Sequence, residues 1–131
     1  MPLKYRYDSS LGAVLTTVTG TMEESDVLEH LRSMRDDPEI PSGFTEIVDF
    51  SSADDFAVKA SGAGRIAFLV PELQDRKKYK GPIFYAPTES AKQMARMFQV
   101  LLENLGIDVG IHEDWEELME VVKERLKNNS T

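Results

Sequence analysis

The chain has 131 residues, of which 41% are hydrophobic, and carries a formal net charge of -8 at pH 7. This length suits one domain with a single core, so we expect one domain over residues 1–127 and a frayed polar tail over residues 128–131. The negative charge argues against a nucleic-acid partner, because phosphate binding requires a cationic surface.

The chain contains no cysteine, which excludes disulfides, thiolate nucleophiles and cysteine metal sites and is compatible with the reducing cytoplasm, where we expect the protein. The longest purely apolar run covers only residues 66–70. We therefore expect neither a secretion signal nor a transmembrane segment.

The first residues predict a β-hairpin. Apolar and charged residues alternate over residues 3–7, turn-forming residues occupy 8–12, and a second strand follows over 13–19. We expect the first strand to be antiparallel to its neighbour.

Three further strands are predicted over residues 46–50, 83–86 and 107–111. Each follows a glycine that marks a turn, namely Gly43, Gly81 or Gly106. These strands should form the parallel centre of a sheet.

Four stretches have apolar residues at helical spacing. The first helix spans residues 22–35 and begins at the capping-box pair Thr21 and Glu24. The second begins near Ser61 and is limited by Pro71, which lacks a backbone donor. The apolar residues that mark the third and fourth helices are Ala91, Met94, Met97, Phe98, Leu101 and Leu105, and then Trp115, Leu118, Met119, Val122 and Leu126.

Strands and helices thus alternate four times. Because crossovers between parallel strands are right-handed, such units wind into one layered α/β structure. We predict a mixed, mainly parallel five-stranded sheet with four helices.

Two segments carry a resemblance to a known family. Residues 47–51 followed by residues 60–66 resemble the strand–loop–helix region of the STAS fold, found in anti-sigma-factor antagonists. In that family a serine at the head of this helix is phosphorylated by partner kinases, and Ser61 is its counterpart. Lys59 and Ala60 stand where the family has an acidic residue and a first serine.

The whole chain is similar to the small bacterial SpoIIAA-like proteins of the STAS fold. The likeness includes a strand ending in Ala-Pro at residues 84–87, the helical segment 95–99, and an acidic helix start at residues 113–118. It implies a STAS-like fold and a regulatory or protein-interaction role. The same architecture forms the lipid-binding half of Sec-type phospholipid transfer proteins.

The segment around Ser61 allows several interpretations. Ser61 is either a structural helix N-cap or a regulatory phosphosite. Gly62, Gly64 and Arg65 fit a dinucleotide-binding pattern, but about eleven residues separate them from the preceding strand, whereas that motif follows its strand directly. Close helix packing explains the glycines better, and an anion site at the helix N-terminus is the alternative.

Other candidates lie in the second half of the chain. Met94, Met97, Phe98 and Leu101 are either core residues or the face for an apolar ligand or a twofold dimer. The basic run over residues 76–80 is either a solubilising loop or a contact for an anionic surface.

Nothing in the sequence forms a recognisable catalytic or metal site. His30 and His112 are the only histidines, and Asp114 and Glu117 have capping-box spacing, which occupies the carboxylates nearest to His112. No serine lies in a nucleophile elbow. The acidic residues Asp49, Asp54 and Asp55 are expected to be solvated.

Two functions are favoured, and an enzyme with an unrecognised site is a third alternative. The first is a non-enzymatic regulatory or protein-interaction module, without cofactor or metal, that forms a homodimer and binds a partner protein. The alternative is a carrier of a lipid or another small apolar ligand.

Overall fold

The computed structural model describes residues 2–129 and shows an α/β protein built on a five-stranded sheet. The strands lie in the order β1-β2-β4-β6-β7, and only β1 is antiparallel to its neighbour. The predicted mixed, mainly parallel sheet with four helices is therefore confirmed. The strands are β1 (Leu3–Asp8), β2 (Ala13–Val18), β4 (Thr45–Asp49), β6 (Pro82–Tyr85) and β7 (Gly110–His112).

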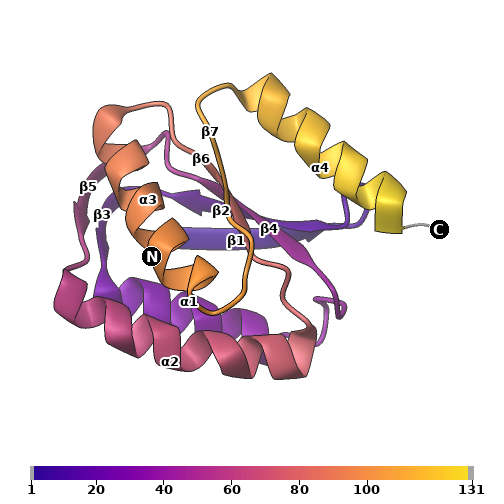
Figure 1. The fold of residues 1–131 in the computed structure, drawn as a ribbon, viewed down its shortest axis with the longest axis horizontal. Coiled ribbons are helices and arrows are strands. Elements are labelled where there is room, and N and C mark those ends of the chain that lie inside the picture. Colours follow the sequence, from indigo (N-terminus) through magenta and orange to yellow (C-terminus); the bar gives the residue numbers. More distant parts are fainter. Residues whose placement is uncertain (1, 130–131) are drawn as a thin grey trace.

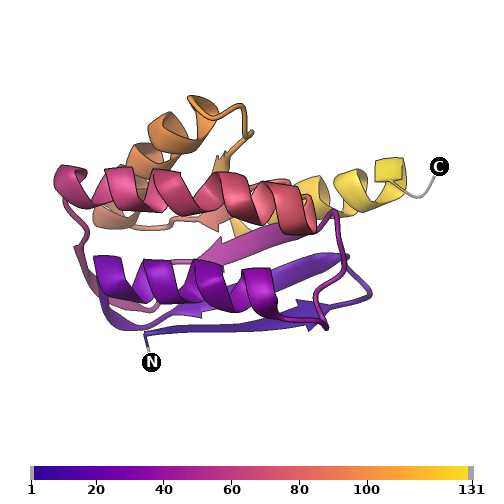
Figure 2. The same cartoon turned by 90° about the horizontal axis from the view of Figure 1, so that it is seen from below.

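The two faces of the sheet are covered unequally. Helices α1 (Glu24–Asp36), α2 (Ala60–Lys77) and α3 (Glu89–Glu103) pack on one face, whereas α4 (Trp115–Asn129) lies on the other (Figure 1). Figure 2 shows α1 and α2 side by side along the sheet. No helix within residues 2–129 is long and apolar enough to cross a membrane.

Side chains that point alternately to the two faces of the sheet divide the core into two clusters. Val14, Val48 and Phe84 face α1, α2 and α3 in the larger cluster. Ile47 and Ile83 point the other way and pack against Leu118 and Val122 of α4, among others. Successive side chains of a strand point to opposite faces, so both clusters follow from the same strands.

A small second sheet was not predicted. Strands β3 (Gly20–Glu23) and β5 (Ala53–Ala57) pair in parallel beside the main sheet. Asp54 and Asp55, expected in a solvated loop, lie in β5 but are exposed. The segments are short and polar, and only their mutual pairing after folding makes them strands.

That second sheet also corrects the predicted start of α1. Thr21 pairs with Asp55 in the small sheet, so it does not cap the helix. The N-cap is Glu23, which forms a capping box with Asp26. The predicted box was displaced by two residues because strand pairing holds the backbone of Thr21 extended.

Pro71 does not end the second helix, contrary to our prediction. Helix α2 continues to Lys77 and ends where Lys78 adopts a left-handed conformation with φ of 54°. Pro71 is exposed, while Val70 and Leu73 are buried on the packed face. Tertiary packing on both sides of the proline outweighs the lost backbone bond.

The C-terminal part also departs from the predicted bounds. The last strand covers Gly110–His112 rather than residues 107–111. The tail expected to fray at residues 128–131 contributes its first two residues to α4, and residues 130–131 lie outside the described part of the chain.

Candidate functional site

A carboxylate is buried in the main core and holds together three parts of the chain. We call the side chains of Thr16, His30, Glu46 and Tyr79 the Glu46 cluster. Thr16 Oγ1 donates to Glu46 Oε2 over 2.6 Å, His30 Nε2 lies 2.6 Å from the same oxygen, and Tyr79 Oη donates to Glu46 Oε1 over 2.8 Å. Every partner of this carboxylate is thus a side chain from a different element or loop.

Local sequence explains why these side chains meet. Glu46 lies two residues before Val48 in β4 and therefore faces the same helical layer. His30 lies on the buried stripe of α1, beside Val27 and Leu31. Tyr79 follows the left-handed residue that ends α2, which turns the chain back over the sheet.

Charges and hydrogen bonds within the cluster outweigh the effect of desolvation on the pKa of Glu46. Burial works to raise the pKa of Glu46, but the charge of His30 and the hydrogen bonds from His30, Thr16 and Tyr79 hold it below its usual value. Burial, together with the neighbouring charge of Glu46, raises the pKa of Tyr79 well above its usual value. The cluster therefore keeps an ionised carboxylate beside a neutral phenol.

A second tyrosine covers the outer side of the cluster. The ring of Tyr5 meets the His30 ring edge-on, with centroids 5.5 Å apart. Its hydroxyl donates to Asp37 Oδ2 over 2.8 Å. Burial and this hydrogen bond raise the pKa of Tyr5 to about 12.

An internal cavity of about 50 Å³ lies next to the cluster, lined mainly by apolar side chains of the sheet, α1, α2 and α3. An engineered cavity of roughly 150 Å³ binds one benzene molecule, so this smaller one has space for a few atoms. No buried side-chain donor or acceptor among the described residues lacks a partner. The cluster thus organises the core, and its own donors are satisfied.

The sequence reasoning did not identify this cluster. The only indication of the cluster in the sequence is Glu46 itself, a single glutamate in a strand whose other residues suit burial. A buried carboxylate needs donors, but the sequence does not say which distant side chains supply them.

Ser61 is not the N-cap of α2, contrary to one of our interpretations. The N-cap is Lys59, which makes no side-chain capping bond, and Ser61 is the second residue of the helix. Ser61 is exposed. The helix begins at Ala60, one residue earlier than a Ser61 cap would require.

The predicted anion site lies beside a carboxylate of the chain itself. A Cβ atom at position 62 would lie 2.8 Å from Glu24 Oε2, which is too close. Because Gly62 has no side chain, α1 and α2 can approach each other closely there. Arg65 Nη1 lies 3.3 Å from Glu24 Oε1, and Gly64 faces open space. Glu24 opposes the binding of an external anion at Gly62, Gly64 and Arg65.

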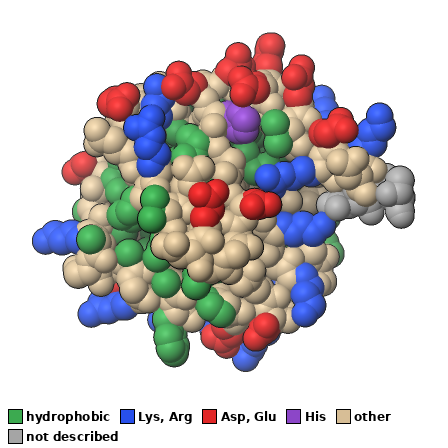
Figure 3. Space-filling model, viewed as in Figure 1, with side chains coloured by type: hydrophobic (Ala, Val, Ile, Leu, Met, Phe, Trp, Pro, Cys, Tyr) green, Lys and Arg blue, Asp and Glu red, His purple; other side chains and the backbone are tan. Residues whose placement is uncertain are grey.

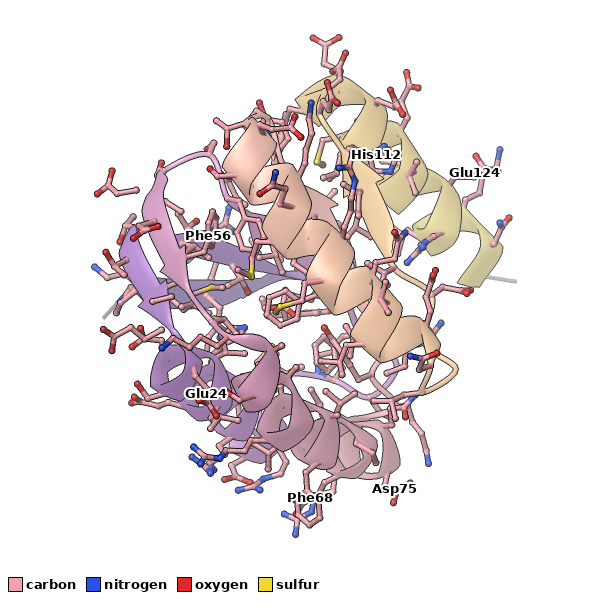
Figure 4. All side chains as sticks on the ribbon, turned by 60° about the vertical axis from the view of Figure 1, so that its left-hand side comes forward. Glu24, Phe56, Phe68, Asp75, His112 and Glu124 are labelled. Carbon is pink, nitrogen blue, oxygen red and sulfur yellow. The ribbon has the colours of Figure 1, made fainter. Side chains whose placement is uncertain are left out.

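The outer face of α2 carries an unusually exposed aromatic ring. Phe68 is 83% exposed, and Figure 4 shows its side chain pointing away from the body of the protein. Ser61, Gly64 and Arg65 precede it at helical spacing and are exposed as well. We call Ser61, Gly64, Arg65 and Phe68 the α2 face.

The apolar residues predicted on α3 divide between core and surface. Phe98 is buried and stacks on Phe84 with centroids 5.8 Å apart. Met94, Met97 and Leu101 are half-buried and pack against the core. Hydrophobic side chains gather over β5 and α3 in the space-filling view (Figure 3).

The basic run over residues 76–80 is largely engaged in structure. Arg76 pairs with Glu72 at 3.3 Å, and Lys77 Nζ donates to the carbonyl oxygens of Asp37 and Ile40. Tyr79 belongs to the Glu46 cluster. These contacts dock the end of α2 onto the loop after α1.

His112 lies at the end of β7, and its Nδ1 is 3.0 Å from Glu117 Oε1. Asp114 caps α4 by accepting from the backbone N–H groups of Glu116 and Glu117. Within the described part of the chain, no group of three histidine, cysteine or acidic residues could hold a metal ion. Asp49 ends β4 in the main sheet, whereas Asp54 and Asp55 lie in β5 of the small sheet.

Comparisons with known proteins bear on the fold. No family model matches the chain. No curated protein matches it either. Among solved structures, it is similar to an uncharacterised protein of the DUF3478 family from Shewanella loihica PV-4, with a TM-score of 0.53 and 12% identity over 92% of this chain and 91% of that one. That structure has a SpoIIAA-like fold, and the resemblance predicted from the sequence is confirmed at the level of the fold.

Proposed function

We propose that this protein is a non-enzymatic regulatory module that binds a partner protein through the α2 face. The observation that carries the proposal is the 83% exposure of Phe68. An exposed aromatic ring gains free energy when a partner covers it, and aromatic residues commonly anchor protein interfaces. The SpoIIAA-like fold supports an interaction role in general.

The charges around Phe68 indicate the chemistry of the partner. Arg65 precedes it by three residues, and its side chain is 75% exposed. Lys59 is exposed at the start of the same helix. Because Glu24 already pairs with Arg65, we expect a partner surface with an apolar pocket for Phe68 and an acidic rim that faces Lys59.

Ser61 offers a means of regulation. It is exposed two helical turns before Phe68, so a phosphate on its hydroxyl would lie in the interface. A phosphate adds a charge of about -1.5 to -2, which an acidic rim would repel. Phosphorylation should therefore release the partner. The absence of cysteine supports our expectation that this exchange occurs in the cytoplasm.

The test uses a photo-crosslinking amino acid at position 68 in living cells of the native host. Position 100 serves as control, because Val100 is also an exposed apolar residue, at 64%. We expect a specific protein crosslinked from position 68 and absent from position 100. Identical crosslinks from both positions would contradict the proposal.

The purified partner then allows a quantitative test by calorimetry. Phe68→Ser and Ser61→Asp should each weaken binding by about tenfold or more, which corresponds to about 1.4 kcal/mol. Val100→Ser should leave the affinity unchanged. Because all three positions are exposed, none of these substitutions should lower the melting temperature.

The cavity beside the Glu46 cluster favours a second function, carriage of a small apolar ligand. Its apolar lining suits such a ligand, but its volume of about 50 Å³ requires the helices to separate before a lipid could enter. Mass spectrometry of the protein under native and then extracting conditions tests this function. A co-purifying lipid would support carriage, and a bare protein mass would contradict it.

A further inference from the structure

The second face of the main sheet is only partly covered. Helix α4 packs over β6 and β7, while exposed residues remain on the same face of β1 and β2. The opening there measures about 340 Å³. We call it the sheet groove, and its lining on this face consists of Lys4, Arg6, Leu15, Thr17, Ile47, Asp49 and Trp115.

Strand register places a row of functional side chains across this face. Lys4 pairs with Thr17, Thr17 with Asp49, and Asp49 with Tyr85. Paired residues point to the same side of a sheet, and the strands are about 4.8 Å apart. An ammonium, a hydroxyl, a carboxylate and a phenol therefore follow one another, with about 10 Å between the backbones at Lys4 and Asp49.

An apolar row runs beside the polar one. Arg6 pairs with Leu15, and Leu15 with Ile47. Arg6 and Lys4 project from the same face of β1, roughly 7 Å apart along the strand. Arg6 also pairs with Asp8 at 3.5 Å, but its side chain stays 69% exposed, so Lys4 and Arg6 are both accessible to an anion at this end of the groove.

An aromatic wall completes the groove. Trp115 is 39% exposed, and its ring meets Tyr85 edge-on with centroids 5.3 Å apart. Asp49 accepts a hydrogen bond from the backbone of Ser51 through Oδ1 over 2.8 Å. A carboxylate can accept further bonds, so Asp49 also offers an acceptor to a ligand.

We propose that the sheet groove binds a small planar aromatic carboxylate that carries a hydrogen-bond donor at its opposite end. The anion pairs with Lys4 and Arg6, and the ring lies on Leu15 beside Trp115. The donor reaches Asp49 or Thr17. Two cations gathered on a chain of net charge -8 favour an anionic ligand at this end. The site is independent of the α2 face.

The probe is 4-hydroxybenzoate, whose two polar groups lie at opposite ends of one ring. Trp115 is the only tryptophan, so its indole N–H signal in a ¹⁵N–¹H spectrum reports on the groove. We expect this signal to shift and to saturate below about 10 mM ligand. Absence of a saturable shift in the unmodified protein would overturn the proposal.

Matched ligands and variants test the stated contacts. The neutral 4-hydroxybenzamide should bind about fivefold more weakly or worse, because it lacks the anion. Lys4→Gln combined with Arg6→Gln should raise the Kd for 4-hydroxybenzoate by a similar factor. Lys123→Gln is the control, since Lys123 is an exposed cation of α4 outside the groove. Equal losses in the control and groove variants, or equal binding of the amide, would overturn the proposal.

Discussion

Three donors converge on the carboxylate of Glu46, and this convergence is what makes its burial tolerable. Its side chain is 4% exposed. An isolated buried carboxylate is costly, whereas one with several hydrogen-bond donors is retained in its charged form. Thr16, His30 and Tyr79 are in turn left without their main partner when Glu46 is removed.

Glu46→Ala should therefore lower the free energy of unfolding by about 3–5 kcal/mol, the usual cost of breaking a buried charge pair. Urea denaturation measures the change. The control is Glu124→Ala on the exposed side of α4 (Figure 4), which should alter stability by less than about 0.5 kcal/mol. Equal effects at both positions would show that Glu46 has no special role.

The same carboxylate predicts a pH dependence of stability. The pKa of Glu46 is lowered by folding, so its contribution is present above the ordinary glutamate pKa of about 4.3. That contribution is lost as pH falls through the lower, folded value. Urea unfolding between about pH 7 and about pH 3 should show a steeper loss for the unmodified protein than for Glu46→Gln. Parallel profiles would contradict this assignment.

At the scale of elements, α2 begins without a side-chain cap. Lys59 has the extended backbone of an N-cap, with φ of -93° and ψ of 160°, but its side chain has no acceptor for the first amides. A lysine charge is also unfavourable at the positive end of the helix dipole. The helix is held instead by its packing against α1, which has its own capping box.

Lys59→Asp should increase the free energy of unfolding by about 1 kcal/mol, because aspartate caps well and suits the dipole. Thermal and urea unfolding would measure the gain. Ser61→Ala is the matched control at the second helical position, and we expect a change below about 0.5 kcal/mol there. A larger loss in Ser61→Ala than the gain in Lys59→Asp would mean that Ser61 is the true cap.

At the scale of the whole molecule, the apolar surface is unevenly distributed. Met94, Met97 and Leu101 of α3 and Phe56 of β5 are half-buried and pack against the main core, and α3 contacts β5. A second copy that covers this strip would remove its apolar area from water, which favours association. The homodimer expected from the sequence stays a prediction, with this strip as its face.

Light scattering tests the dimer. We expect a mass of twice 14.8 kDa for the unmodified protein and a return to 14.8 kDa for Met97→Lys. Gln93→Lys introduces the same charge at an exposed position of α3 and should remain dimeric. A mass near 14.8 kDa at all concentrations of the unmodified protein would contradict the prediction.

Most of the fold could be predicted from local sequence patterns. Alternating residues in β1, glycine turns before β4, β6 and β7, and apolar spacing in the four helices each report on nearby residues. The candidate sites were harder to predict. The pattern around Ser61 drew attention to α2 but placed the cap on the wrong residue, and it did not single out Phe68.

The sequence by itself determined the chain order of the helices and main-sheet strands and the parallel winding of that sheet, because periodicity and right-handed crossovers depend on short stretches of chain. Only the tertiary structure decided that β3 pairs with β5, that α2 continues through Pro71, and that Glu46 meets His30 and Tyr79. It also decided that Phe68 on α2 and Lys4 and Thr17 on the sheet stay exposed, with Asp49 half-buried beside them. These features depend on contacts between residues far apart in the chain, and a local sequence pattern does not identify the distant residues that will contact it.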